Sequence, residues 1–147
     1  MEFFRRAEAA AGLPPLPDEV WTPAWRDIFE PLPDALAALA RVRSTVPKVI
    51  VSNTNPLHWE GVLRVTDVTR LVDATVLSFR EGRMKPDSAF FATALAEAGV
   101  RAREAVFADD RLENVDAARR LGLDAFAVES SQQFADALSE RGLLEPL

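Results

Sequence analysis

Short apolar runs alternate along this chain with longer stretches in which apolar residues recur every three to four positions. Short, β-branched runs are typical of strands covered on both faces, and the three-to-four spacing is typical of amphipathic helices. The chain opens with helical patterns and then alternates between strand and helix. We predict strands at 48–51, 74–77, 105–108 and 125–128, and helices at 2–11, 18–29, 34–43, 56–63, 87–98, 111–121 and 132–141.

Residues that favour helix starts support several of these boundaries. Asn55 followed by Pro56 is typical of an N-cap and first helical position. Pro86 is expected to start the helix that follows it, because its fixed φ suits a first turn. Asp110 and Glu113 have the spacing of a capping box, so we predict that they cap the helix after the third strand.

The order of elements predicts an α/β fold: a Rossmann-like parallel sheet with right-handed crossovers and helices on both faces. In such sheets, ligands bind beyond the carboxyl ends of the strands. Ser52, Asn53, Asp109 and Asp110 all fall at predicted carboxyl ends. Their convergence predicts a site at this edge.

Composition excludes several classes of function. The chain has 147 residues, a net charge of −6 and no cysteine. This length suits about one domain, and the lack of cysteine excludes thiol catalysis and disulfides. The acidic balance argues against nucleic-acid binding, and the apolar runs are too short to span a membrane. Without a signal-peptide pattern, the cytoplasm is the expected compartment.

Each candidate site residue has a functional and a structural interpretation. Asp109 and Asp110 suit a hard cation such as Mg²⁺, but Asp110 could instead be a helix cap and Asp109 a loop acid. Lys85 could balance a phosphate, or it could be a solvated surface lysine. Ser52 could donate to a phosphate oxygen beside the backbone N–H of Asn53, or both could simply form a turn.

Three segments resemble one known family: Val-Ser-Asn-Thr-Asn at 51–55, Lys-Pro-Asp at 85–87 and Ala-Asp-Asp-Arg-Leu-Glu-Asn at 108–114. They are similar to motifs II, III and IV of the haloacid dehalogenase-like (HAD) hydrolases, which are mostly magnesium-dependent phosphatases. Ser-Asn-Thr-Asn-x-x-His-Trp at 52–59 and Trp-x-x-Ile-Phe-Glu-Pro at 25–31 resemble the branch of small sugar-phosphate phosphatases and the N-terminal phosphatase domain of soluble epoxide hydrolases.

The resemblance implies hydrolysis of a small phosphorylated metabolite with Mg²⁺. It implies that Ser52, Asn53 and Lys85 bind phosphate, with Lys85 also balancing charge in catalysis, and that Asp109 and Asp110 bind the metal. It further implies two regions, a helical cap remnant at 1–30 and a HAD-like α/β core at 31–147.

Motif I of the family, an Asp-x-Asp whose first Asp is the nucleophile, has no match: no Asp-x-Asp followed by Gly or Thr occurs. Covalent catalysis needs an in-line carboxylate, so we expect this chain alone to be inactive or weak. In the family this motif ends the central strand, between the strands that end at Ser52 and Asp109. Those two strands must therefore pair directly, leave a gap, or accept a strand from a partner or a homodimer.

Three hypotheses remain open. The chain is a truncated product of a HAD-type phosphatase, a non-catalytic homologue that binds a phosphorylated ligand or a protein, or an α/β domain whose function lies in its aromatic N-terminal helices. His58, the only histidine, is a possible pocket-lining residue. The aromatic residues of the opening helices could form a lid, a core or an oligomer surface; they are Phe3, Phe4, Trp21, Trp25 and Phe29.

Overall fold

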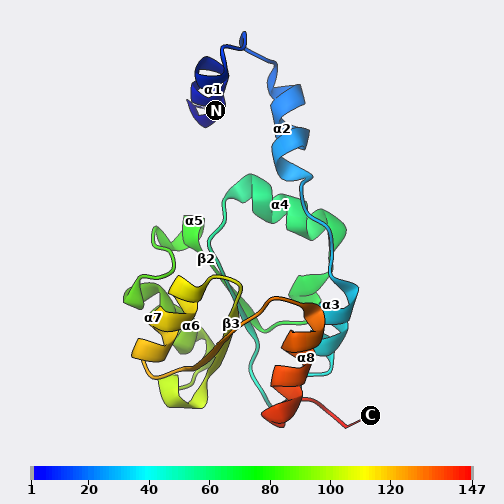
Figure 1. The fold of residues 1–147 in the computed structure, drawn as a ribbon, viewed down its shortest axis with the longest axis vertical. Helices are drawn as coiled ribbons and strands as arrows, with labels where there is room; N and C mark the ends of the chain where they lie inside the picture. The colour runs from blue at the N-terminus through cyan, green and yellow to red at the C-terminus, as the bar shows by residue number, and fades with distance from the viewer. Residues whose placement is uncertain (1, 147) are drawn as a thin grey trace.

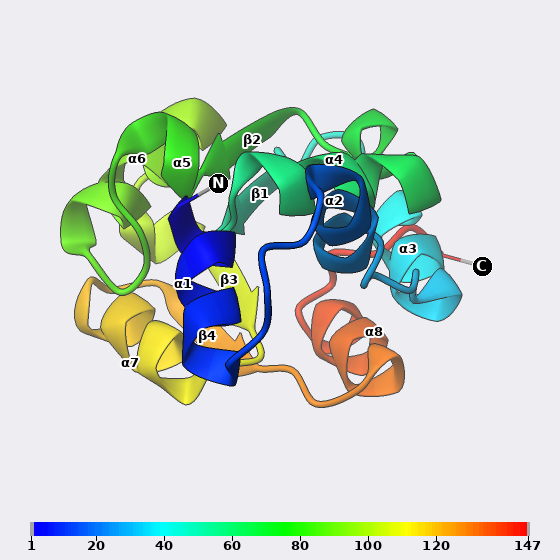
Figure 2. The same ribbon diagram turned by 90° about the horizontal axis from the view of Figure 1, so that it is seen from above.

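The structure, a computed structural model, describes residues 2–146, with side chains from Phe4 onward. Figures 1 and 2 show an α/β body with two helices, α1 and α2, standing on one side of it. None of the described helices is long and apolar enough to cross a membrane. The helices are α1 (Glu2–Ala11), α2 (Asp18–Arg26), α3 (Pro33–Ala40), α4 (Pro56–Val65), α5 (Ser78–Glu81), α6 (Ser88–Ala98), α7 (Leu112–Arg120) and α8 (Ser131–Glu140).

The four strands are β1 (Val49–Ser52), β2 (Ala74–Leu77), β3 (Val106–Asp109) and β4 (Asp124–Ala127), each within one residue of its predicted position. All pairings are parallel, as predicted. The sequence predicts a single sheet, and for residues 2–146 this prediction is wrong. Strand β1 pairs with β2, and β3 pairs with β4, in two separate sheets. Of the three arrangements expected for β1 and β3, the described chain has the gap.

Two apolar clusters hold the body together. One lies between β3, β4, α6 and α7 and includes Phe91, Phe107 and Val115. The other lies against β1 and β2 and is built on Val76 and Phe90. In Figure 1, α6 and α7 lie on one side of the strands and α3 and α8 on the other. Helices therefore cover both faces of the strands, as the pattern predicts.

Helix boundaries show where local signals are sufficient. Asn55 caps α4 as predicted, accepting from the backbone N–H of His58 at 3.0 Å. The helix after Pro86 begins later than predicted, at Ser88, because the side chain of Asp87 accepts from the N–H of Ala89 and caps it.

Two other predicted boundaries are wrong. The capping box of Asp110 and Glu113 does not form: Arg111 is the N-cap residue of α7, with no side-chain cap. Helix α2 ends at Arg26, before the predicted Phe29. Pro23 lies inside α2 and provides no N–H for the helix. The last turn closes with the N–H of Asp27 bonded to the carbonyl of Pro23.

Helices α1 and α2 pack on each other through aromatic rings. Phe4 stacks on Trp21 with 5.3 Å between ring centroids and meets Trp25 edge-on at 6.1 Å. Beneath them Glu8 is buried, and one of its carboxylate oxygens accepts from the indole N–H of Trp21 at 2.6 Å. The described opening aromatics therefore form a small core of their own, while the side chain of Phe3 lies outside the described residues.

Candidate functional site: a buried lysine–aspartate pair

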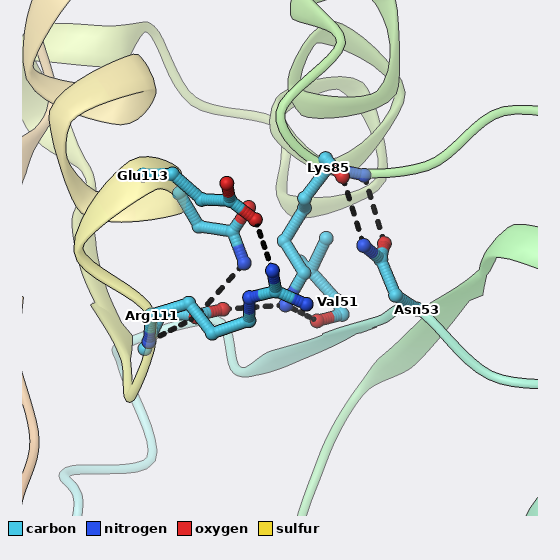
Figure 3. A network of polar contacts seen from close by, with 7 residues as sticks. Val51, Asn53, Lys85, Arg111 and Glu113 are labelled. Atoms are coloured by element: carbon cyan, nitrogen blue, oxygen red, sulfur yellow. Dashed lines mark hydrogen bonds and ion pairs between the residues drawn. The ribbon is translucent and has the colours of Figure 1, made fainter.

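The candidate site lies at the carboxyl ends of β1 and β3, which face each other across the gap. Ser52 ends β1 and Asp109 ends β3, and Lys85 reaches between them from the loop that precedes α6. Figure 3 shows this network, with Lys85 and Asn53 on one side and Arg111 on the other. Parallel strands place the carboxyl ends of β1 and β3 at one edge, as the sequence pattern predicts.

The ammonium group of Lys85 is the centre of the network. Its Nζ donates to Oδ2 of Asp109 at 2.6 Å and to the carbonyl oxygen of Val51 at 2.6 Å. The Lys85 side chain is 9% exposed and that of Asp109 is 5% exposed. Nζ also lies 5.6 Å from the centroid of the Phe107 ring. A buried charge needs such partners, so the surface-lysine interpretation of Lys85 is wrong.

Asn53 fixes the backbone of Lys85 from the opposite side. Its Nδ2 donates to the carbonyl oxygen of Lys85 at 2.8 Å, and its Oδ1 accepts from the N–H of Lys85 at 2.8 Å (Figure 3). This paired contact resembles that between two strands and orients the lysine toward the gap. Sequence reasoning missed this positioning role because the two residues are 32 positions apart.

Asp109 is satisfied by three donors. Besides Lys85, its Oδ1 accepts from the backbone N–H of Arg111 and from Nδ2 of Asn114, both at 2.9 Å. Burial alone would raise the pKa of Asp109, but the hydrogen bonds from Lys85, Asn114 and Arg111 outweigh it and hold the pKa below its usual value. Asp109 is therefore a carboxylate at neutral pH, with its charge directed into the site.

Asn114 and Arg111 also were not singled out from the sequence. Asn114 is 2% exposed, and its Oδ1 is buried without a hydrogen-bond partner in the described chain. Arg111 pairs with Glu113 at 2.5 Å near the start of α7 (Figure 3). The available signal was position: Asn114 lies in the first turn of α7, where its amide can reach back to the end of β3.

The remaining predicted residues lie around this pair. Asp110 is exposed and has no hydrogen bond or ion pair within the described residues. Ser52 is half-buried and lines a cavity of about 360 Å³ together with Leu36 and Trp59. Its role and that of Asp110 stay predictions.

His58 is not part of the lysine–aspartate network. Its ring lies 5.1 Å from that of Trp25 and 5.4 Å from that of Phe29, centroid to centroid. Its Nε2 is buried and has no hydrogen-bond partner among the described residues. His58 thus joins α4 to the aromatic packing of α2, and a pocket-lining role stays a prediction.

The oxygen atoms at this edge fit a magnesium ion that keeps most of its water. Mg²⁺ is usually held by one or two carboxylates, with water and phosphate completing its shell. Asp109 and Asp110 are adjacent carboxylates at the end of β3. No group of three or more acidic or histidine side chains suited to a metal occurs in residues 2–146. The donor set therefore suits Mg²⁺ together with phosphate better than a tight metal site made of protein alone.

Comparison with known proteins identifies a family for most of the chain. Residues 2–122 match the family model described as haloacid dehalogenase-like hydrolase. The structure resembles a wild-type HAD-family enzyme from Bacteroides thetaiotaomicron in complex with magnesium and inorganic phosphate, with 24% identity and a TM-score of 0.76, over 88% of this chain and 68% of that one. A predicted HAD-like hydrolase from Porphyromonas gingivalis matches with 19% identity and a TM-score of 0.74, over 96% and 72%.

Two further matches extend beyond these enzymes. An uncharacterized protein from Corynebacterium glutamicum is 26% identical with a TM-score of 0.62, over 78% of this chain and 82% of that one. Drimenol cyclase drtB from Aspergillus calidoustus is 37% identical over 73 residues, which are 50% of this chain and 14% of the cyclase. The chain thus spans a small part of this curated relative.

Proposed function

We propose, for a chain that belongs to the haloacid dehalogenase-like hydrolases, that the carboxyl ends of β1 and β3 bind the phosphate group of a small metabolite together with Mg²⁺. The observation that carries this proposal is the buried ion pair of Lys85 and Asp109. A lysine held in an apolar wall beside a carboxylate provides a fixed positive charge at the mouth of the site. The magnesium and phosphate bound by the Bacteroides enzyme support the assignment.

Each residue has a proposed task. Lys85 contributes its ammonium charge to a phosphate oxygen, and Asn53 keeps the lysine backbone in place. Ser52 donates its hydroxyl at the end of β1, beside the backbone N–H of Asn53. Asp109 and Asp110 would hold the magnesium ion, which when bound supplies positive charge to the phosphate oxygens.

We further propose that this chain alone hydrolyses phosphate esters weakly or not at all. Within residues 2–146, Lys85 Nζ contacts a single carboxylate, that of Asp109, and this carboxylate is already engaged by three donors. For covalent catalysis of the aspartyl type, the nucleophile must be a free carboxylate in line with the leaving group. Positioning groups without one leave residual catalysis at most.

Hydrolysis of an aryl phosphate by the purified chain, with Mg²⁺ or with EDTA, tests this proposal. Lys85→Ala and Asp109→Ala are compared with Lys48→Ala, since Lys48 is the only other lysine and lies at the opposite end of β1. We expect wild-type turnover barely above that of the variants. Metal-dependent turnover abolished by both site variants and retained by Lys48→Ala would show a nucleophile and contradict the inactive assignment.

A second candidate function is ligand binding without chemistry, favoured by the three hydrogen bonds that hold Asp109 in place. It predicts that inorganic phosphate with Mg²⁺ binds to the chain even when turnover is undetectable. Binding that is unaffected by Asp109→Ala would instead favour a function located in the aromatic helices α1 and α2.

A further inference from the structure

The gap between the two sheets is a groove of about 420 Å³ lined almost entirely by apolar residues. Its long walls are β1 and β3. Phe91 and Leu95 of α6 close one face, and Leu39 of α3 with Phe134 and Leu138 of α8 closes the other. The groove is therefore covered by helices above and below and bounded by a strand on each side.

The backbone of β3 presents hydrogen-bonding groups to this groove. Asp124 donates its N–H to the carbonyl of Ala105, and Val128 donates to that of Asp109, so the odd-numbered residues of β3 face β4. In a parallel ladder, alternate residues bond to opposite sides. The N–H and C=O groups of Val106 and Ala108 therefore point into the groove.

The backbone of β1 does the same from the other wall. Ala74 donates its N–H to the carbonyl of Lys48, which places the even-numbered residues toward β2 and leaves Val49 and Val51 facing the groove. The bond from Lys85 Nζ to the Val51 carbonyl agrees with this direction. In residues 2–146, no backbone hydrogen bond outside the ladders involves Val49, Val106 or Ala108.

The backbone N–H and C=O groups that face the groove form two rows, one on β1 and one on β3, and these rows determine what class of occupant fits. Unpaired strand edges are templates for another strand, and buried backbone groups without partners are costly. A small apolar ligand would fill the volume and leave both rows unpaired. An extended polypeptide would bond to both rows, and its side chains would meet apolar surfaces on both faces, which requires a nearly continuous apolar sequence.

The charge at one end of the groove sets the direction of a bound strand. Lys85 lies across the carboxyl end of the groove, between Val51 and Asp109. A strand that runs parallel to β1 and β3 directs its carbonyl end toward this ammonium group, whereas an antiparallel strand would direct its amino end there.

We propose that the groove between β1 and β3 binds an extended apolar segment of another chain, about five residues long, as a central strand parallel to both walls. The proposal does not depend on phosphate chemistry. It makes the two separate sheets of residues 2–146 into one sheet of five strands when the segment is bound.

A fluorescein-labelled peptide tests the proposal directly. Its sequence is Lys-Lys-Val-Ile-Val-Ile-Val with a free carboxylate. The control peptide carries N-methyl groups on the valines, which occupy alternate positions, and these methyl groups remove backbone hydrogen-bond donors. We expect saturable binding by anisotropy for the first peptide and roughly tenfold weaker binding for the second. Equal binding of the two peptides, or none of either, would overturn the proposal.

Amide hydrogen exchange locates the bound peptide. We expect the N–H groups of Val49, Val51, Val106 and Ala108 to exchange at least about tenfold more slowly in the complex. Binding that leaves these four amides unchanged would place the peptide elsewhere and overturn the proposal. If these amides are protected from exchange without peptide, and the protection increases with protein concentration, a second copy of the chain occupies the groove. That result would also overturn the proposal.

A matched pair of variants separates the groove edge from general damage to the fold. Ala108→Pro removes an N–H that faces the groove, and Ala127→Pro removes one from the outer edge of β4. We expect the first variant to weaken peptide binding roughly tenfold and the second to leave it unchanged within about twofold. If Ala108→Pro does not fold, the N-methylated peptide provides the same test on the unaltered protein.

Discussion

At the scale of single residues, the burial of Lys85 is the feature with the largest consequences. The sequence suggested its role through the Lys-Pro-Asp string, but its partners, Asp109, Val51 and Asn53, come from other segments. Local patterns carry no signal for contacts 24 to 34 residues apart, so the network itself was not predictable. Which residues lie at the site was predictable, and how they hold one another was not.

Breaking this ion pair should destabilise the fold more than removing both charges. Lys85→Met leaves the Asp109 carboxylate buried beside an apolar side chain, so we expect the free energy of unfolding to fall by about 3–5 kcal/mol. Adding Asp109→Asn keeps an acceptor for Arg111 and removes the charge, and should recover part of this loss. Urea unfolding of both variants beside Lys48→Met checks the order; a double variant less stable than Lys85→Met would contradict it.

Glu8 should make the contact between α1 and α2 sensitive to acid. Burial alone would raise the pKa of Glu8, but hydrogen bonds from Leu16, Trp21 and Arg5 outweigh it and lower the pKa below the ordinary 4.5. The stabilisation is therefore complete above pH 4.5 and is lost as pH falls through the lower folded-state value.

The indole N–H resonance of Trp21, followed by NMR during acid titration, measures this loss. We expect the resonance to move below pH 4.5 in the wild-type chain. In Glu8→Gln, which keeps an acceptor but does not titrate, we expect no such movement. The same titration curve in both proteins would contradict the assignment to Glu8.

At the scale of elements, strands were predicted within one residue, because short apolar runs between helices leave little choice of position. Helix ends were predicted less well where proline or side-chain caps compete, as at Arg26 and Ser88. The short helix α5 was missed entirely: Ser78–Glu81 is too short for any periodicity to be visible. Its start is fixed by a distant contact, since the Ser78 hydroxyl bonds to the backbone of Thr54 at both N–H and C=O.

The junction of α2 and α4 depends on one glycine. A Cβ at Gly61 would overlap with the carbonyl oxygen of Arg26 and would lie 3.1 Å from the ring of Phe29. Helix propensity alone predicts that Gly61→Ala stabilises α4 by about 1 kcal/mol. We expect the opposite sign in thermal unfolding, with chemical shifts changing in α2 and not around Phe90; a higher melting temperature would contradict the close packing.

At the scale of the whole molecule, two parallel pairs of strands flank a groove and share a polar edge at Lys85. The family resemblance predicted that a strand would be missing between β1 and β3, and the structure places a gap there among the described residues. The composition predicted a single domain, but no pattern in it predicts that the backbone groups on both sides of the gap are left facing each other. That property follows from register, which only the folded chain defines.

The most direct measurement of the central claim is calorimetric titration of the chain with inorganic phosphate in the presence of Mg²⁺. Asp110→Asn removes an exposed carboxylate at the proposed metal position, and Asp116→Asn removes an exposed carboxylate on α7, away from that position. We expect phosphate binding that requires Mg²⁺, weakens several-fold in Asp110→Asn and is unchanged in Asp116→Asn. Binding that is independent of Mg²⁺, or equally affected by both substitutions, would contradict a phosphate and magnesium site at the ends of β1 and β3.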